Sequence, residues 1–559
     1  MSKTGSQILL DTLKNENVEY IFGLPGGVVI PLFDTLFDDT DLKFILTRHE
    51  QAAGHAADGY ARATGKVGVC IVTSGPGATN LTTAIATAYM DSIPMVAITG
   101  QVKTHLIGSD AFQEADITGI TRPITKHNYL VKDIRDLAKV VKEAFYIAST
   151  GRPGPVVIDL PVDITTDKWN GDIPEEVNLP GYKPSYEGNI RQIKIAADAI
   201  NRSKRPVIYA GGGVISSNSS KQLIELAEKA NLPVNTTLMA LGVFPEDNEK
   251  ALGMLGMHGT VPANYAVHES DLLIAIGARF DDRITGKIDE FAPQAQIIHI
   301  DIDPTSISKN IRVDIPVVGD ANNILTELIK HVSYVERKEW FEKISKWKKK
   351  YRLSYDNTGD VVKPQYVVEQ ICQATKGKAI ITTEVGQNQM WAAQYYTYTS
   401  PRSFISSGGL GTMGFGFPAA IGAQLGCPDK IVIDIAGDGS FQMNIQELST
   451  VVKYKLPVKV AILNNGYLGM VRQWQEMFYD KRYAHTRLDG NPDFVQVAKA
   501  YGAEGFLVEK KEDVRPVIEK AISINGPVVI DFKVDPEENV FPMIPAGQAI
   551  SQIKGIELI

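Results

Sequence analysis

The segment 431–465 opens with the residues IVIDIAGDGS (431–440) and closes with VKVAILNN (458–465). Its two apolar, β-branched runs are typical of buried strands in a parallel sheet. A helix-length stretch separates them, and a strand–helix–strand unit places its two strands parallel. Their carboxyl ends then meet at one edge, where open α/β sheets bind ligands. The segment therefore predicts an α/β fold with a site at that edge.

The stretch between the two strands has helical spacing, with apolar residues Ile445, Leu448 and Val451. A helix is expected to begin at Asn444, with Glu447 completing a capping-box start.

Asp438 and Asn465 are predicted to converge at the shared edge. Carboxylate and amide oxygens suit Mg²⁺, which usually completes its shell with water and phosphate oxygens. Gly437, Gly439 and Ser440 form a turn whose backbone can approach a diphosphate closely. The alternative is a glycine-rich turn with an unrelated pair of asparagines.

Gly-Asp-Gly followed at this distance by Asn-Asn resembles the signature of thiamine-diphosphate enzymes. The resemblance implies that Asp438, Asn465 and the backbone carbonyl of Tyr467 hold Mg²⁺. It also implies that the Gly437–Ser440 turn binds the cofactor.

Composition is that of an ordinary globular chain of 559 residues, with 44 % hydrophobic and 22 % charged residues. The net charge of −8 gives no basic field for nucleic acid or an anionic membrane. Three cysteines argue against a disulfide framework or a zinc site. No segment has the character of a signal peptide or a membrane span, so a cytoplasmic protein is expected.

Alternating helix and strand patterns predict three doubly wound parallel-sheet domains and a tail. By resemblance their roles are pyrimidine binding at 1–165, FAD binding at 190–335 and diphosphate and Mg²⁺ binding at 364–540, with a tail at 541–559. A charged helix over 336–352 is expected to be anchored by Trp340 and Trp347. The small residues between Ala52 and Gly59 predict a helix that packs closely on a neighbour.

The position of Glu50 in the sequence allows two interpretations of its role. With Thr47 it fits a capping box, in which the carboxylate bonds a backbone amide. The segment Arg48-His49-Glu50-Gln51-Ala52-Ala53 also resembles the one that carries the activating glutamate of thiamine-diphosphate enzymes. That resemblance implies a hydrogen bond from the cofactor's aminopyrimidine ring to Glu50, which promotes deprotonation of the thiazolium carbon.

Further thiamine-diphosphate contacts are implied by motif position in the last domain. These residues are Val385, Gly386, Gln387, Asn388, Gly411 and Met413, with Met413 propping the bent cofactor. Relatives often have Asp and His where this chain has Glu384 and Asn388.

The middle domain narrows the resemblance to the large, catalytic subunits of biosynthetic acetolactate synthases. Gly256-Met257-His258-Gly259-Thr260 and Gly277-Ala278-Arg279-Phe280-Asp281-Asp282-Arg283 carry it, and it spans essentially the whole chain. It implies an FAD with a structural, non-redox role. The flavin contacts implied are Arg152, Gly211, Gly212, Gly213, Met257, His258, Gly277, Ala278, Arg279, Asp281, Arg283, Asp301, Ile302, Asp320 and Ala321.

The same resemblance implies that Arg283 binds the carboxylate of a second keto acid and that Trp474 contacts its alkyl group. Gly27, Phe112 and Gln113 match further active-site positions. Many relatives have lysine where this chain has Val162.

The implied reaction decarboxylates pyruvate and transfers the two-carbon unit to pyruvate or 2-oxobutyrate, for branched-chain amino acid synthesis. The resemblance further implies a homodimer or tetramer with the site between subunits, and a small regulatory subunit. A flavin-dependent pyruvate oxidase, a flavin-free catabolic acetolactate synthase and an inert scaffold are the alternatives.

Overall fold

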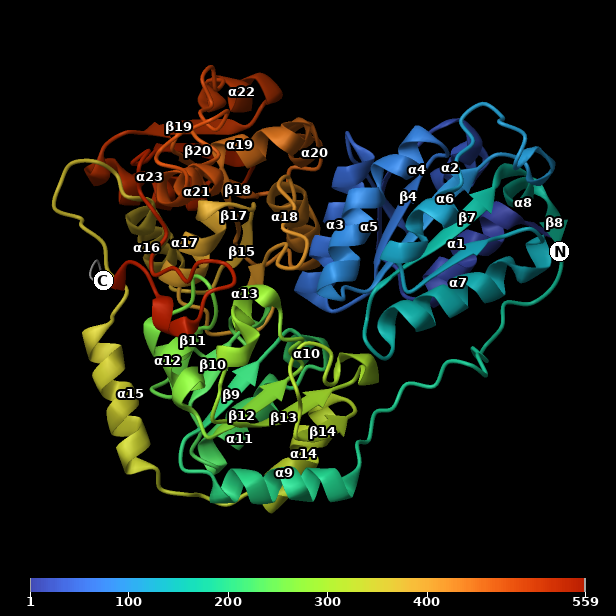
Figure 1. Cartoon of the computed structure of the whole chain (residues 1–559). Helices are drawn as coiled ribbons and strands as arrows, with labels where there is room; N and C mark the ends of the chain where they lie inside the picture. Colours follow the sequence, from blue (N-terminus) through green and yellow to red (C-terminus); the bar gives the residue numbers. More distant parts are fainter. Residues whose placement is uncertain (1, 557–559) are drawn as a thin grey trace.

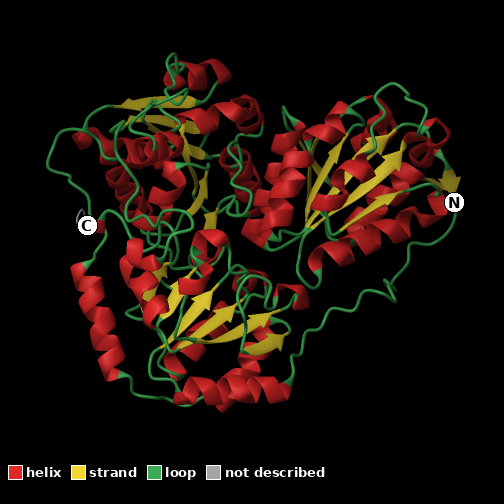
Figure 2. Cartoon of the chain, viewed as in Figure 1, coloured by secondary structure: helices red, strands yellow, loops and turns green. Residues whose placement is uncertain are grey.

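The computed structural model describes residues 2–556 and contains three six-stranded parallel sheets that follow one another along the chain. Figure 1 shows the three resulting domains as separate lobes around a common centre. Figure 2 shows helices on both faces of each sheet. The α/β class and the three doubly wound domains are as predicted. Of the predicted ranges, Met1 and residues 557–559 lie outside the described part.

The first sheet has the order β3-β2-β4-β5-β7-β6. Its strands are β2 (Tyr20–Leu24), β3 (Lys43–Leu46), β4 (Gly68–Val72), β5 (Met95–Gln101), β6 (His127–Leu130) and β7 (Pro155–Pro161). The helices are α1 (Gly5–Asn15), α2 (Ile30–Phe37), α3 (Glu50–Thr64), α4 (Pro76–Asn80), α5 (Thr82–Asp91), α6 (Ile117–Thr121), α7 (Ile134–Ser149) and α8 (Val162–Thr166). A short antiparallel pair, β1 (Lys3–Thr4) and β8 (Lys168–Trp169), closes this domain.

The middle sheet has the order β11-β10-β9-β12-β13-β14. Its strands are β9 (Pro206–Ala210), β10 (Val234–Thr236), β11 (Ala251–Met254), β12 (Leu272–Ile276), β13 (Gln296–Asp301) and β14 (Ile315–Val318). The helices are α9 (Ile190–Arg202), α10 (Gly213–Ser216), α11 (Ser220–Lys229), α12 (Val261–Glu269), α13 (Asp282–Thr285) and α14 (Ala321–His331). Chain order reverses between β9 and β12, the arrangement in which dinucleotides bind across the crevice.

The last sheet has the order β16-β15-β17-β18-β20-β19. Its strands are β15 (Ile380–Thr383), β16 (Phe404–Ile405), β17 (Val432–Gly437), β18 (Lys459–Asn464), β19 (Glu504–Val508) and β20 (Val528–Lys533). The helices are α16 (Pro364–Thr375), α17 (Gln387–Tyr395), α18 (Gly416–Gly426), α19 (Asp438–Phe441), α20 (Leu448–Lys453), α21 (Gly469–Phe478), α22 (Phe494–Tyr501) and α23 (Lys511–Ser523).

The first and last sheets have the same topology. In each, the second strand in chain order lies outside the first, and the sixth lies inside the fifth. Chain order reverses between β2 and β4 in one sheet and between β15 and β17 in the other. Open α/β sheets bind ligands at such reversals, so each of these two domains presents one equivalent binding edge.

The first and last domains pack through α3 and α18, which lie against each other in Figure 1. Their backbones touch: a Cβ built on Gly59 would lie 2.2 Å from the carbonyl oxygen of Ala419, and one on Gly422 would lie 1.9 Å from that of Ala56. The close packing predicted for the small-residue helix is confirmed.

Helix α15 (Lys338–Lys350) runs along the middle domain toward the last domain. Trp340 is buried, and its Nε1 donates to the carbonyl of Pro206 at 3.1 Å. The Trp347 ring meets the Trp340 ring edge to face, with centroids 5.8 Å apart. Both tryptophans anchor the helix as predicted. Among residues 2–556, no helix is both long enough and apolar enough to cross a membrane.

The helix predicted to begin at Asn444 is wrong in its start. Asp438–Phe441 is already helical, a 3-10 segment spans Gln442–Glu447, and α20 begins at Leu448. Asn444 has non-helical dihedrals, and its side chain donates to the carbonyl of Gly414 at 2.6 Å instead of capping a helix. Tertiary contacts therefore override the local capping signal.

Candidate active site

The carboxyl edge of the last sheet brings Asp438 and Asn465 together. Gly437 of β17 lies opposite Leu463 of β18. Asp438 comes one residue after Gly437 and Asn465 two residues after Leu463, so both lie at the same edge of the sheet. Asp438 is buried, and its Oδ2 accepts a hydrogen bond from Asn491 at 2.6 Å. Asn465 Oδ1 accepts from the backbone amide of Tyr467 at 3.0 Å. The predicted placement of both residues at one edge of the sheet is confirmed.

The donor set at this edge fits a hard divalent cation. Burial raises the pKa of Asp438 to about 6, and a neighbouring cation would favour its ionised form. Within the described chain no group of three or more His, Cys, Asp or Glu side chains is placed to bind a metal. A cation here would therefore depend on one carboxylate, the Asn465 amide, the Tyr467 carbonyl and phosphate oxygens, a set that suits Mg²⁺.

Gln387 and Asn388 begin α17 beside this edge, but their side-chain N–H groups are already used. Gln387 Nε2 donates to Gln473 Oε1 and to the carbonyl of Glu538, both at 2.9 Å. Asn388 Nδ2 donates to the carbonyls of Glu384 and Ile435, at 3.0 and 2.8 Å. Their backbone amides at the helix N-terminus are therefore the groups left for a phosphate.

Glu384 fixes the loop that carries Met413. Its carboxylate accepts from the backbone amides of Gly414 and Phe417 at 2.6 and 3.0 Å, at the N-terminus of α18. Burial raises the pKa of Glu384 to about 7, and the amides oppose that shift. The acid at this position thus orients the loop of the predicted prop residue.

Glu50 opens α3 at the equivalent edge of the first sheet. His49 caps the helix, because its Nδ1 accepts from the amide of Gln51 at 3.0 Å. Thr47 instead donates to the carbonyls of Gly23 and His49. The capping-box reading of Thr47 and Glu50 is therefore wrong.

The surroundings of Glu50 fit a polar ring. Its Oε2 accepts from Asn80 at 2.9 Å, and a Cβ on Gly77 would lie 3.3 Å from its Oε1. Thr73 and Ser74, after β4 at the same edge, carry buried hydroxyls with no partner. Such orphaned groups mark a place where a ligand can bind.

Glu447 anchors the segment in front of Glu50 from the last domain. Its side chain is buried, and its carboxylate accepts from the backbone amide of Arg48 at 2.9 and 3.2 Å. Arg48 Nε in turn donates to Ser449 Oγ at 3.1 Å. The start of α3 is thus held by the element that follows Asp438.

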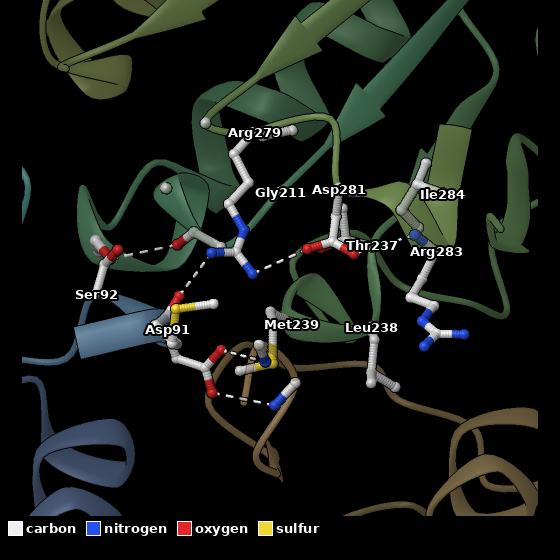
Figure 3. Close-up of a pocket in the computed structure, with 18 of the residues that line it drawn as sticks. Asp91, Ser92, Gly211, Thr237, Leu238, Met239, Arg279, Asp281, Arg283 and Ile284 are labelled. Atoms are coloured by element: carbon white, nitrogen blue, oxygen red, sulfur yellow. Dashed lines mark hydrogen bonds and ion pairs between the residues drawn. The ribbon is translucent and has the colours of Figure 1, made fainter. Parts of the chain in front are cut away.

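A cavity of about 620 Å³ lies where the three domains meet. Figure 3 shows part of its wall, with Asp91 and Ser92 from the first domain facing Arg279 and Asp281 from the middle one. The last domain contributes Gly408, Gly409 and Trp474 among others. All of the predicted flavin residues line it: Arg152, Gly211, Gly212, Gly213, Met257, His258, Gly277, Ala278, Arg279, Asp281, Arg283, Asp301, Ile302, Asp320 and Ala321.

The cavity fits an elongated dinucleotide. The turns after β9 and β12 meet at the reversal point of the middle sheet, where a Cβ on Gly277 would lie 2.5 Å from Gly213 Cα. This contact leaves backbone, with no side chains, facing the crevice. Thr237 Oγ1 and His258 Nδ1, both in residues that line the cavity, are buried without partners and can serve a ligand.

Arg283 and Trp474 lie together in this cavity although they come from different domains. The Arg283 guanidinium carbon is 5.6 Å from the centroid of the Trp474 ring. About half of the Arg283 side chain is exposed, and its nearest carboxylate, on Asp282, is 3.8 Å away. The guanidinium is therefore available to an anionic substrate.

Only some of the predicted site residues line the large cavity. Val385, Gly386 and Gly411 line it with Arg283 and Trp474, whereas Glu50, Gly27, Phe112, Gln113 and Met413 do not. Phe112 is 88 % exposed, and a Cβ on Gly75 would lie 2.7 Å from the carbonyl of Gln113. Asp438 and Asn465 are also absent from the cavity lining, so the predicted metal ligands and Glu50 all lie outside it.

Sequence reasoning missed Asn80 and Asn491, gave Glu384 no role of its own and gave Glu447 only a capping role. Asn80 and Asn491 lie far along the chain from the carboxylates they bond, so no spacing links them. Glu384 directly follows a buried strand and precedes Val385 and Gly386, and that position was a usable signal.

Comparison with known families agrees with the three domains. Residues 3–120, 193–328 and 384–532 match the N-terminal TPP-binding, central and C-terminal TPP-binding domains of thiamine pyrophosphate enzymes. The fold is thus that of a thiamine-diphosphate-dependent enzyme.

Curated relatives are similar over nearly the whole length. The acetolactate synthase large subunit of Haemophilus influenzae is 49 % identical, with 98 % of each chain covered. That of Mycobacterium tuberculosis is 51 % identical over 99 % of this chain and 91 % of its own. The probable large subunit of Methanocaldococcus jannaschii is 51 % identical over 98 % and 95 %. The chain belongs to the acetolactate synthase large-subunit family of thiamine pyrophosphate enzymes.

Proposed function

We propose that this chain is the catalytic large subunit of an acetolactate synthase, acting early in branched-chain amino acid biosynthesis. It decarboxylates pyruvate and transfers the two-carbon unit to pyruvate or 2-oxobutyrate. One observation carries the proposal: identity of about half over the full length of acetolactate synthase large subunits, with Glu50, Asp438, Asn465, Arg283 and Trp474 in place.

Thiamine diphosphate supplies, when bound, the electron sink that a decarboxylation next to a carbonyl requires. Asp438, Asn465 and the Tyr467 carbonyl would hold Mg²⁺ against its diphosphate. The backbone amides of Gln387 and Asn388, with the turn from Gly437 to Ser440, would bind phosphate oxygens.

Glu50 provides the acid–base catalysis of the proposed reaction. Its buried carboxylate, held by Asn80, would accept a hydrogen bond from the pyrimidine ring and so favour the protonation state that the chemistry needs. Met413, on the loop fixed by Glu384, supports the bend of the cofactor. The other predicted active-site residues, Gly27, Phe112 and Gln113, help to orient substrates and to exclude water.

Arg283 binds the carboxylate of the second keto acid, because its planar fork matches a carboxylate and lacks a close ion partner. Trp474 stacks beside it and contacts the alkyl group of the acceptor. The residues that line the cavity at the three-domain junction would hold FAD in a structural role, which the strand reversal and the glycine contacts there support.

The active site is proposed to form between two copies of the chain, with Glu50 from one and Asp438 from the other. This arrangement follows from the resemblance to thiamine-diphosphate enzymes, with Glu50 at the start of α3 in the first domain and Asp438 at the start of α19 in the last. The relatives' names specify a large subunit, and a separate small regulatory subunit is proposed on that ground. The enzyme is proposed to act in the cytoplasm.

The purified protein tests this function directly. Acetolactate formation from pyruvate should require both thiamine diphosphate and Mg²⁺, with flavin colour unchanged during turnover. Bleaching of the flavin by pyruvate would instead indicate an oxidase. Full activity in protein shown to be free of flavin would indicate the catabolic synthase.

A further inference from the structure

The turn that ends α5 contacts both other domains at the wall of the large cavity (Figure 3). Asp91 Oδ1 accepts from the amide of Gly409 at 2.7 Å, and Oδ2 accepts from the amide of Gly408 at 3.0 Å. One residue earlier, the carbonyl of Met90 accepts from Arg279 of the middle domain at 3.0 Å. The turn thus joins all three domains by direct hydrogen bonds.

Asp91 belongs to a buried charge cluster with Asp58 and Arg62. Their side chains are 1 %, 0 % and 5 % exposed. Arg62 donates to Asp58, to Asp91 at 2.9 Å and to the carbonyl of Ser406 at 2.8 Å. Two carboxylates share one guanidinium, so the remaining negative charge depends on the amides of Gly408 and Gly409. A buried charge is tolerated when it is hydrogen-bonded in this way.

The bonded loop packs closely against side chains of the first and middle domains. A Cβ on Gly409 would lie 2.8 Å from Asp91 Oδ1 and 2.9 Å from Arg279 Nη2, and one on Gly408 would lie 2.3 Å from Met239 Sδ. Gly408, Gly409 and Gly411 line the cavity, and Met413 follows two residues later. The loop is therefore shared between the proposed flavin site and the proposed thiamine-diphosphate site.

We propose that Asp91 is a positioning residue for both cofactors: by holding the amides of Gly408 and Gly409, it sets the cavity wall on one side and the Met413 loop on the other. This inference rests on the proposed FAD and thiamine-diphosphate sites. Without the carboxylate, the amides of Gly408 and Gly409 compete for a single acceptor oxygen and the loop shifts, so both cofactors lose part of their site.

The test compares Asp91→Asn with Asp58→Asn in the full-length protein. Both variants remove one carboxylate from the same cluster, but Asp58 contacts Arg62 and not the glycine loop. FAD dissociation constants come from flavin fluorescence titration of the apoprotein, and those of thiamine diphosphate from calorimetry with Mg²⁺. Asp91→Asn should raise the dissociation constant of FAD by about tenfold or more, and it should also raise that of thiamine diphosphate. Asp58→Asn should lower Tm and weaken the binding of both cofactors clearly less than Asp91→Asn does, because its effect on the loop is only indirect, through Arg62.

If Asp91→Asn does not fold, Asp91→Glu replaces it, since it keeps the charge and displaces the carboxylate by one methylene. It should fold and still weaken FAD. Equal dissociation constants for FAD in the Asp91 and Asp58 variants would overturn the inference. The cluster would then only stabilise the fold. Failure of the wild-type protein to bind FAD would instead count against the proposed function, before any variant is made.

Discussion

At the scale of single residues, Glu50 carries the acid–base chemistry. Its carboxylate is steadied by Asn80 and lies next to two unpartnered hydroxyls. Glu50→Gln keeps the shape of the side chain but replaces one acceptor oxygen with a donor. Acetolactate formation should fall by about 10²–10⁴-fold, the usual contribution of a positioned acid or base. A steady-state assay measures this, with thiamine-diphosphate binding checked by calorimetry.

Glu143→Gln serves as the matched control. Glu143 is another buried glutamate of the first domain, and its partner is Tyr129 instead of a residue at the site. It should leave acetolactate formation within about twofold. Undiminished activity in Glu50→Gln protein would contradict the role given to Glu50.

The sequence predicted the position of residues best where they belong to one motif. Asp438 and Asn465 directly follow adjacent strands, and parallel pairing places both at the same sheet edge. Gln387 and Asn388 show the limit of this prediction. The sequence gives the polarity of their side chains, but not that their N–H groups already bond Gln473 and the carbonyls of Glu538, Glu384 and Ile435.

At the scale of elements, the contact of α3 with α18 fixes the first domain on the last. Gly422→Ala places a methyl group 1.9 Å from the carbonyl of Ala56. Because two helix backbones must separate to make room, Tm should fall by about 5 °C or more in thermal denaturation. Gly181→Ala, with open space around its Cβ, should change Tm by less than about 1 °C. Equal Tm values for both variants would contradict the close packing of the two helices.

Strand β7 carries a buried acid that links stability to pH. Asp159 accepts from Thr99 and Gln101 at 2.7 and 2.9 Å, and Gln101 also donates to the carbonyl of Ala115, near the Phe112 loop. Burial raises the pKa of Asp159 to about 7, from 3.8. The folded state therefore binds the extra proton between these values, and this group's contribution to stability falls as pH rises from 4 to 7.

Asp159→Asn removes this titration. The Tm of the wild-type protein minus that of the variant should decrease as pH rises from 5 to 7 and level off above it, as measured by calorimetry. A difference that stays constant over this range, or that grows with pH, would show that Asp159 is ionised in the folded protein throughout.

Hydrophobic periodicity predicted the positions of the helices and strands, but the predicted start of the helix after Asp438 is wrong. Asn444 and Glu447 have the right spacing for a capping box, yet Asn444 bonds Gly414 and Glu447 bonds Arg48. Both partners come from other parts of the fold. Local sequence cannot rank such long-range bonds against a local cap.

At the scale of the whole molecule, three sheets and their order along the chain were predictable from alternating patterns. The packing of α3 on α18 and the meeting of Arg283 with Trp474 were not evident from periodicity, because no short-range pattern records contacts between domains. The resemblance supplied Arg283 and Trp474 as a pair, and the geometry places them side by side.

The most direct test of an active site shared by two copies is a mixed dimer of Glu50→Gln and Asp438→Asn chains, each with its own affinity tag. If Glu50 of one chain works with Asp438 of its partner, a heterodimer has one site with both defects and one intact site. Each variant alone should be nearly inactive, and the purified heterodimer should form acetolactate at about half the wild-type rate. A heterodimer as inactive as its parents would contradict the shared site, because each chain would then spoil a site of its own.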